Sequence, residues 1–250
     1  MTGIVISDIL NIRRRRMPRK SPFINTKSLK DQVYDYLRFQ LRRGNIQPGS
    51  EIKMDETAAN LGVSKTPLRD ALLQLAMENF VTILPRRGVI VNPLTLEEIK
   101  NSYEIIGALE SLAILKAGAS LTQKDFETMH KLIEAMRKAI ARDDFDTYYE
   151  RNLEFHGVYL DLSDNPELKR IVTTLKKRLY DFPRKSVYVR EWEERSIGEH
   201  EQLLRLLEEG RYEEAACFVR DVHWSFEVQK DFILKYYPEA ASEKARRRLL

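Results

Sequence analysis

The chain has 250 residues, of which 43% are hydrophobic and 32% are charged. Its 10 glycines and 9 prolines fall below the roughly 12% of average usage, which excludes collagen-like or low-complexity stretches. The single cysteine, Cys217, cannot form an intramolecular disulfide, and no apolar run reaches the roughly 18 residues of a membrane helix. With no recognisable signal peptide, these features predict a folded protein of one or two domains in a reducing cytoplasm, without a membrane partner.

Charge is divided unevenly along the chain. Residues 1–96 contain 16 Lys and Arg against 8 Asp and Glu, whereas residues 97–250 contain 26 against 30. A basic first part followed by a mildly acidic second part is typical of a protein whose first part meets a polyanion. The same excess also occurs as ordinary surface charge, so it indicates nucleic acid without deciding for it.

The two ends of the chain carry basic segments. Residues 1–26 contain the run Arg13 to Arg16, interrupted further on by Pro18 and Pro22, and are expected to form a flexible arm. Such an arm is either a solvated tail or a segment that lies along DNA phosphates. Residues 238–250 are expected to form a basic C-terminal tail.

Residues 27–95 show the pattern of a helix-turn-helix. Apolar residues recur at helical spacing over Leu29–Arg43 and again over Met54–Leu61, which ends at Gly62. Ser64 is a candidate N-cap for a third helix to Asn79, with Pro67 in its first turn. Two helices around such a turn place the N-terminal residues of the second one in the major groove.

A β-hairpin is predicted directly after the third helix. Phe80–Leu84 and Val89–Asn92 have strand-like composition, and Pro85-Arg-Arg-Gly88 lies between them. The tip carries Arg86 and Arg87, which either reach the DNA backbone or minor groove or simply face solvent. A helix-turn-helix followed by a β-hairpin predicts a winged helix with a two-stranded wing.

The residues of this region resemble the winged-helix domain of GntR-type bacterial transcription regulators. The similarity covers residues 28–95 and rests on four segments: Tyr34-Asp-Tyr-Leu37, Ile46-Gln-Pro-Gly-Ser50, Leu61-Gly-Val-Ser-Lys-Thr-Pro-Leu-Arg-Asp-Ala-Leu72 and Arg86-Arg-Gly-Val89. The resemblance implies double-stranded DNA as partner. It also implies that DNA is contacted by Ser64, Lys65, Thr66 and Arg69 of the recognition helix and by Gly88 of the wing.

One position departs from the family pattern. The family most often has arginine where this chain has Lys65. Lysine lacks the planar fork that grips guanine O6 and N7 with two hydrogen bonds. We therefore expect weaker base selection at Lys65, with phosphate neutralisation unchanged.

The sequence pattern predicts helices throughout residues 96–237. Thr95 is a candidate cap, and the predicted helices are Leu96–Ser120, Gln123–Ala141, Asp144–Leu162, Pro166–Asp181, Glu191–Glu209 and Tyr212–Tyr237. Six helices with short connections predict an antiparallel bundle that can enclose a ligand site. The predicted fold class is mainly α, with a winged helix followed by this bundle.

Three of the four histidines lie on three different predicted helices. His156, His200 and His223 each stand among apolar residues, and each alone is more often a core histidine than a ligand. Asn152 stands one turn before His156 and can add an oxygen. If they converge, three imidazoles and an oxygen suit zinc or another first-row divalent ion such as nickel. His130 lacks such a setting and is expected at the surface.

The same part of the chain resembles the FCD effector domain found in many GntR-type regulators. The similarity covers residues 97–237 and rests on Asn152-Leu-Glu-Phe-His-Gly-Val-Tyr159, Asn165-Pro166, Glu199-His200 and Asp221-Val-His223. It implies an all-helical domain that binds a small metabolite, often a carboxylate, beside a metal held by an acidic residue and three histidines. It also implies a homodimer.

Two positions differ from the FCD pattern. Asn152 stands where the family normally has aspartate, so we expect lower metal affinity and a site more positive by one charge, which favours an anionic effector. Ile106, four residues before Glu110, stands where the family often has an arginine that would pair with a carboxylate.

Three functions follow from these patterns. The first is a dimeric regulator, predicted to be a repressor, that binds a palindromic operator and senses a small molecule. The second is a metal-dependent hydrolase in which the three histidines activate water and Glu154 or Glu199 acts as base. Adjacent helical residues diverge by about 100°, so these glutamates do not share a face with the histidines, which disfavours the enzyme. The third is a purely structural ion.

Overall fold

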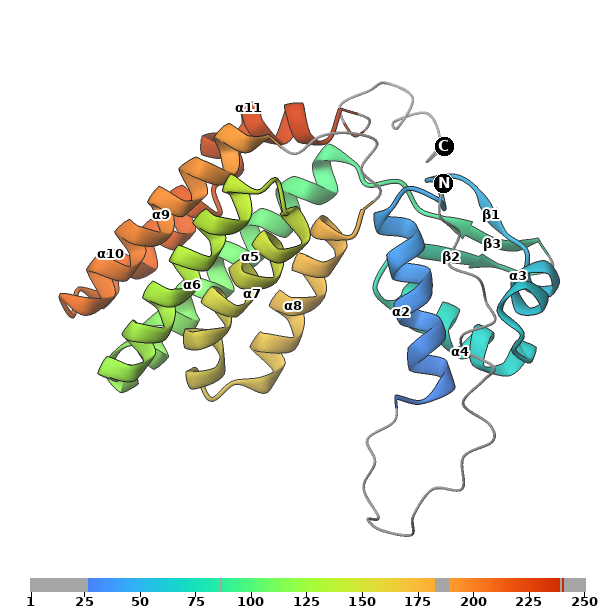
Figure 1. Cartoon of the computed structure of the whole chain (residues 1–250), viewed down its shortest axis with the longest axis horizontal. Helices are drawn as coiled ribbons and strands as arrows, with labels where there is room; N and C mark the ends of the chain where they lie inside the picture. The colour runs from blue at the N-terminus through green and yellow to red at the C-terminus, as the bar shows by residue number, and fades with distance from the viewer. Residues whose placement is uncertain (1–26, 86, 183–188, 239, 241–250) are drawn as a thin grey trace, which may run out of the picture.

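The structure is a computed structural model that describes residues 27–85, 87–182, 189–238 and 240. It contains a winged helix and a helical bundle joined by the segment between β3 and α5 (Figure 1). The predicted arm of residues 1–26 lies outside the described residues, as does Arg86. Of the predicted tail 238–250, only Pro238 and Ala240 are described.

The winged helix is built on three helices: α2 (Leu29–Arg42), α3 (Met54–Leu61) and α4 (Lys65–Met77). The Ser28 hydroxyl accepts from the Asp31 amide while the Asp31 carboxylate accepts from the Ser28 amide, which starts α2 with a capping box. Gly62 ends α3 with a φ of 63°, which glycine adopts without a steric penalty. The predicted helix-turn-helix is therefore confirmed.

A small antiparallel sheet completes the winged helix. β2 (Val81–Leu84) and β3 (Gly88–Val91) form the predicted hairpin. A further strand, β1 (Glu51–Ile52), pairs with β3, so the sheet has three strands in the order β1-β3-β2 rather than two. The sequence did not reveal β1 because two residues show no alternation, and its partner is far away along the chain.

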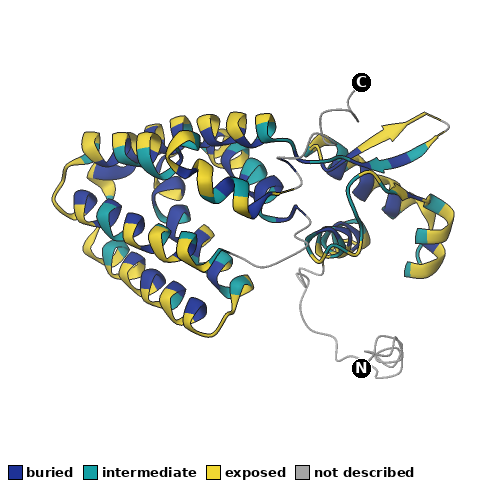
Figure 2. Cartoon of the chain, turned by 90° about the horizontal axis from the view of Figure 1, so that it is seen from above, coloured by how far each residue is buried: buried dark blue, intermediate teal, exposed yellow. Residues whose placement is uncertain are grey.

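The bundle begins with five helices whose bounds agree with the predicted ones within three residues. They are α5 (Leu96–Ala117), α6 (Gln123–Ala141), α7 (Phe145–Leu162), α8 (Pro166–Tyr180) and α9 (Arg190–Glu208). Each turns buried residues inward and exposed residues outward (Figure 2). Helix α5 is central, because it packs against α7, α8, α10 and α11.

The prediction of one continuous helix over Tyr212–Tyr237 is wrong. The structure divides it into α10 (Tyr212–Phe218), a π-helical turn (Val219–His223) and α11 (Phe226–Tyr236). The Ser225 hydroxyl accepts from the Val228 amide and starts α11 as a new helix. Among the described residues the bundle thus has seven α-helices rather than six, and the π-helical turn carries His223.

The two parts meet at the end of α8. Arg178 is 4% exposed, donates to the Pro93 carbonyl at 2.8 Å, and lies over the rings of Phe80 and Phe182. Arg38 of α2 forms an ion pair with Asp181. The described helices include none with the length and apolar character that crossing a bilayer demands.

Candidate DNA-binding surface and metal centre

The first turns of α4 present polar side chains to solvent. Ser64, Lys65, Thr66 and Arg69 are all exposed, whereas Leu68, Ala71, Leu72 and Leu75 are buried against α2 and the sheet. Ser64 occupies the N-cap position, but its hydroxyl makes no capping hydrogen bond. Lys65 and Arg69 therefore project from one open flank of the helix, and Lys65 forms an ion pair with Asp55 of α3.

The wing packs against the same helix, because β2 contacts α4. Arg87 is exposed at the tip, next to Gly88. Gly88 has a φ of 96°, and a Cβ there would lie 2.6 Å from the Glu51 Oε1. The Glu51 side chain can move aside, but a positive φ is strained for any residue with a Cβ, so glycine is favoured at this position of the wing.

Within the bundle, three helical elements bring His156, His200 and His223 together. Their ligand atoms all lie within 4.8 Å of one another, and the Nε2 atoms of His156 and His200 are 3.2 Å apart. Metal–nitrogen bonds of 2.0–2.1 Å in a tetrahedral site separate two ligand nitrogens by about 3.3 Å. The sequence-predicted triad is thus assembled, and His156 and His200 have the nitrogen–nitrogen spacing that a shared divalent ion requires.

The Nδ1 atoms of two of these rings are hydrogen-bonded to carboxylates. The His156 Nδ1 lies 2.8 Å from the Glu110 Oε2, and the His223 Nδ1 lies 2.8 Å from the Glu199 Oε2. Glu110 also accepts from Tyr159 and Trp224 and forms an ion pair with Lys176 at 2.5 Å. Carboxylates on the outer nitrogen fix the ring tautomer and leave Nε2 for a metal.

Burial keeps the imidazoles of His156 and His200 neutral. Desolvation lowers the pKa of His156 to about 3, despite the opposing charge of Glu110, and it lowers the pKa of His200 well below its ordinary value. Burial raises the pKa of Glu110, but the Lys176 ammonium and the hydrogen bonds from His156 and Lys176 outweigh this effect and hold that pKa below its usual range. A neutral ring offers a lone pair, as a metal ligand must.

Asn152 lies next to this cluster. Its Nδ2 donates to the Tyr180 hydroxyl at 3.1 Å, while its Oδ1 is buried and makes no hydrogen bond. The His200 Nδ1 is likewise buried without a hydrogen-bond partner. A buried amide oxygen is costly unless it has a partner, so the residues present fit a metal that would be held by Asn152 and the three histidines.

A cavity of about 40 Å³ adjoins Asn152, His223 and Glu199. It has room for about three water molecules. Tyrosine and tryptophan rings form most of its wall, and none of its described lining residues is lysine or arginine. Because Glu193 and Glu199 also line the cavity, a carboxylate ligand there would need the positive charge of a bound metal.

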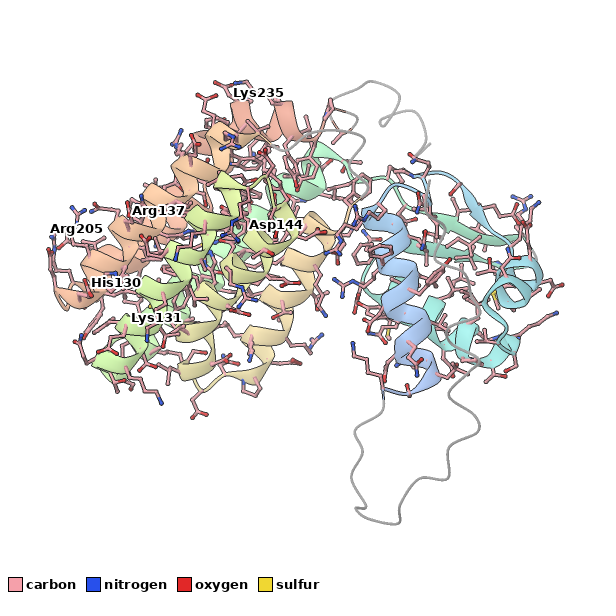
Figure 3. All side chains as sticks on the ribbon, in the orientation of Figure 1. His130, Lys131, Arg137, Asp144, Arg205 and Lys235 are labelled. Atoms are coloured by element: carbon pink, nitrogen blue, oxygen red, sulfur yellow. The ribbon has the colours of Figure 1, made fainter. Side chains whose placement is uncertain are left out.

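The remaining candidates lie elsewhere or take other roles. His130 is exposed on α6, where it contacts Glu208 at 2.8 Å, as expected (Figure 3). Glu154 is exposed and pairs with Arg151, and Glu199 is engaged by His223, Gln229 and Arg195. Neither glutamate is placed as the general base that the hydrolase hypothesis requires.

Lys176 is a site residue that the sequence analysis missed. It is 1% exposed, although lysine is almost never fully buried unless it is paired. Its position between Val172 and Leu179 on the apolar stripe of α8 was the available signal. Only the fold shows that its partner is Glu110.

Family models match both parts of the chain. Residues 29–91 match bacterial regulatory proteins of the gntR family, and residues 101–222 match the FCD domain. The chain belongs to the GntR family, in its FCD-containing form. Members of this family are bacterial regulatory proteins. FCD domains commonly bind metals, which agrees with the three-histidine cluster.

Curated relatives include repressors. The chain is 27% identical over 139 residues to the HTH-type transcriptional repressor RspR of Escherichia coli, which is 56% of this chain and 61% of RspR. It is 25% identical over 200 residues to the gluconate operon transcriptional repressor of Bacillus subtilis, which is 78% of this chain and 81% of that protein.

Solved structures agree in fold. The regulator resembles E. coli McbR/YncC with a TM-score of 0.61 at 24% identity, covering 86% of this chain and 99% of that one. It resembles a putative GntR regulator from Rhodococcus sp. RHA1 with a TM-score of 0.62 at 16% identity, covering 86% and 98%. At these identities the likeness shows the fold alone.

Proposed function

We propose that this regulator acts in the cytoplasm as a repressor that binds a palindromic operator as a homodimer and responds to a small organic acid at the metal centre. The observation that carries this proposal is the set of contacts made by α8. Its side chains contact Glu110 and Asn152, which lie beside the histidine cluster, and they also contact the winged-helix region. Effector binding can therefore shift the equilibrium between two arrangements that differ in affinity for DNA.

On the DNA side, the proposal rests on exposed cations and a formed wing. Lys65 and Arg69 point away from the core of the winged helix, with Ser64 and Thr66 beside them. Arg87 and Gly88 contribute from the hairpin. Arginine in the major groove contacts guanine edges, and lysine neutralises phosphates.

On the effector side, the proposal rests on the histidine cluster. A divalent ion, zinc or nickel, would be held by Asn152, His156, His200 and His223, and it would polarise a bound carboxylate. The small cavity limits the ligand to a few atoms unless the surrounding side chains move. A hydrolase is disfavoured, because Glu154 is paired with Arg151 and Glu199 is held by the His223 ring.

Helix α8 joins these two sides. Lys176 binds Glu110 behind His156, and Tyr180 accepts from Asn152. Two residues from each of them on the same helix, Arg178 contacts Phe80 and the Pro93 carbonyl of the winged-helix region. A movement of α8 at the metal centre would therefore also move the side chains of α8 that contact the DNA-binding domain.

The function is tested by selecting DNA ligands and then adding effectors. Selection from random duplexes should yield palindromes, because a two-fold dimer presents two recognition helices. Zinc-loaded protein should then be screened against small organic acids by thermal shift, since a ligand of the native state raises its melting temperature. A hit should change operator affinity by about 5- to 150-fold. Failure to enrich any duplex would contradict the proposal.

Replacing Arg178 with methionine should uncouple effector binding from operator affinity. The substitution keeps an apolar stem between Phe80 and Phe182 but removes the hydrogen bond to the Pro93 carbonyl. Metal binding should be unchanged, while the effector-dependent change in operator affinity should fall to less than about 3-fold. Anisotropy titrations with and without effector measure this change.

The matched control is Arg170→Met. Arg170 lies on the exposed side of α8 and pairs only with Glu167 among the described contacts. This variant should respond like the wild type. A full response in Arg178→Met would show that the signal does not pass through the end of α8.

A further inference from the structure

The cavity beside the histidine cluster has a wall made largely of aromatic rings. The ring centres of Tyr149 and Tyr180 lie 4.8 Å apart, and those of Trp192 and Tyr236 lie 5.4 Å apart. An aromatic ring carries partial negative charge on its face, and several such rings around one site are the usual way in which proteins bind an ammonium group. Six rings contribute to this wall: Tyr103, Tyr149, Tyr180, Trp192, Trp224 and Tyr236.

Two buried carboxylates line the same cavity. Glu193 is 5% exposed and Glu199 is 8% exposed. Glu199 accepts a hydrogen bond from Gln229 at 2.9 Å, and its other oxygen lies 2.8 Å from the His223 Nδ1. Glu193 accepts from the Tyr149 hydroxyl at 2.9 Å. The wall therefore combines aromatic rings with the negative charge of Glu193.

Phenol oxygens add hydrogen-bond acceptors beside Glu193. The hydroxyl oxygens of Tyr149 and Tyr236 lie 2.9 Å apart, and both residues line the cavity. A hydroxyl that donates its proton keeps lone pairs with which it can accept. An ammonium group has three N–H donors and no acceptor. Its donors and its charge thus match the carboxylate, the phenol oxygens and the rings.

A ligand with a carboxylate alone matches this cavity less well. It would bring its negative charge close to Glu193 and Glu199, and none of the described lining residues is lysine or arginine. Like charges repel strongly where water is largely excluded. An ammonium group on the same ligand offsets this repulsion. The cavity volume of about 40 Å³ further restricts the ligand to the smallest molecules that carry both groups.

We infer that this cavity binds a small amino acid, with the ammonium group held by Glu193 and the surrounding rings and the carboxylate directed towards the metal centre. The inference rests on the effector site of the proposed function and names the ligand class of that site. Glycine, the smallest amino acid, is the first probe.

Intrinsic fluorescence reports whether the cavity is occupied, because the two tryptophans of the chain, Trp192 and Trp224, both line it. The zinc-loaded full chain should be titrated with glycine and with glycolate, in which a hydroxyl group replaces the ammonium. Glycine should bind at least about tenfold more tightly, because hydrogen bonds between charged partners are the stronger ones. Elemental analysis after each titration checks that the zinc is retained. Equal or tighter binding of glycolate would overturn the inference.

Methylammonium tests the ammonium half of the ligand without the metal. Titrated into the metal-free chain, it should change the tryptophan fluorescence in a saturable way, whereas acetate should not. A metal-free chain whose fluorescence does not respond to methylammonium would overturn the inference.

Glu193→Gln removes the charge of the carboxylate and keeps its shape. The preference for glycine over glycolate should fall to less than about threefold, and retained glycolate binding shows that the cavity is still formed. The matched control is Glu191→Gln on the same helix, where the side chain is 74% exposed and pairs with Lys235. This control should keep the full preference. A tenfold preference that persists in Glu193→Gln would overturn the assignment, and the wild-type titrations decide the ligand class if that variant does not fold.

Failure of the inference is distinguishable from failure of the proposed function. Glycolate that binds and changes operator affinity, with no binding of glycine, would overturn the inference and leave an organic acid as effector. Glycine that binds with the expected preference but changes operator affinity in no measurable way would support the ligand class and contradict the effector role of the site.

Discussion

Replacing Arg69 with alanine should weaken operator binding by at least about 30-fold. A bidentate contact to a base is worth about 1–3 kcal/mol, and a dimer loses it at both half-sites. Arg69 is exposed on the flank of α4 that faces away from the core, so its removal should leave folding intact. Fluorescence anisotropy with the selected palindrome measures the loss.

Lys65→Ala should weaken binding with a different signature. Lysine acts as a point charge on phosphate, so the loss should be similar for specific and nonspecific duplexes, and the slope of affinity against salt should decrease by about 1 per half-site. Lys65 must leave Asp55 to reach DNA, so Asp55→Asn should bind DNA at least as tightly as the wild type.

Lys124→Ala is the matched control for both substitutions. Lys124 is an exposed cation on α6, in the bundle, and its removal should not change operator affinity. Wild-type affinity in both Lys65→Ala and Arg69→Ala would reject α4 as the recognition helix, whatever the bundle binds.

His200→Ala should abolish stoichiometric metal binding. The imidazole is completely buried, and its Nε2 lies 3.2 Å from that of His156, so the substitution removes one nitrogen from the centre of the cluster. Altering even an outer partner of a metal ligand costs about 10–100-fold in affinity, so losing a ligand should cost at least about 100-fold. Elemental analysis after dialysis against zinc or nickel measures the metal content.

Two variants make this result specific. His130→Ala removes an exposed histidine of α6 that Figure 3 labels on the outer surface, and its metal content should stay at the wild-type level. Asn152→Asp replaces the buried amide oxygen with a carboxylate and should raise metal affinity by about tenfold or more. Unchanged metal content in His200→Ala would contradict the site.

Chelation separates a sensing ion from a structural one. If the metal-free protein keeps its helix content but no longer responds to the effector, the ion belongs to the sensor. If chelation melts the bundle and a reloaded protein ignores every metabolite, the ion is structural. A metal-free protein that still responds would contradict the proposed role of the metal.

Much of the fold was predictable because its signals are local. Caps, glycine stops and apolar stripes act over about one helical turn, and they placed α2, α6 and α8 within a residue of their observed ends. The same local logic put Lys65 and Arg69 on one exposed face of α4. The two-residue β1 and the division of the last helix at the π-helical turn were not predictable, because pairing with β3 and packing against α5 decide them.

The sequence by itself determined which residues were available to the metal centre: three histidines on three helices, with Asn152 one turn before the first. Only the tertiary structure decided that they converge, because His156 and His200 are 44 residues apart and the relative height of two packed helices depends on their core side chains. The tertiary structure alone also placed Glu110 and Lys176 behind the histidines and Arg178 against the winged helix. These contacts join distant segments, and no local pattern specifies the register between helices that meet only when the core is packed.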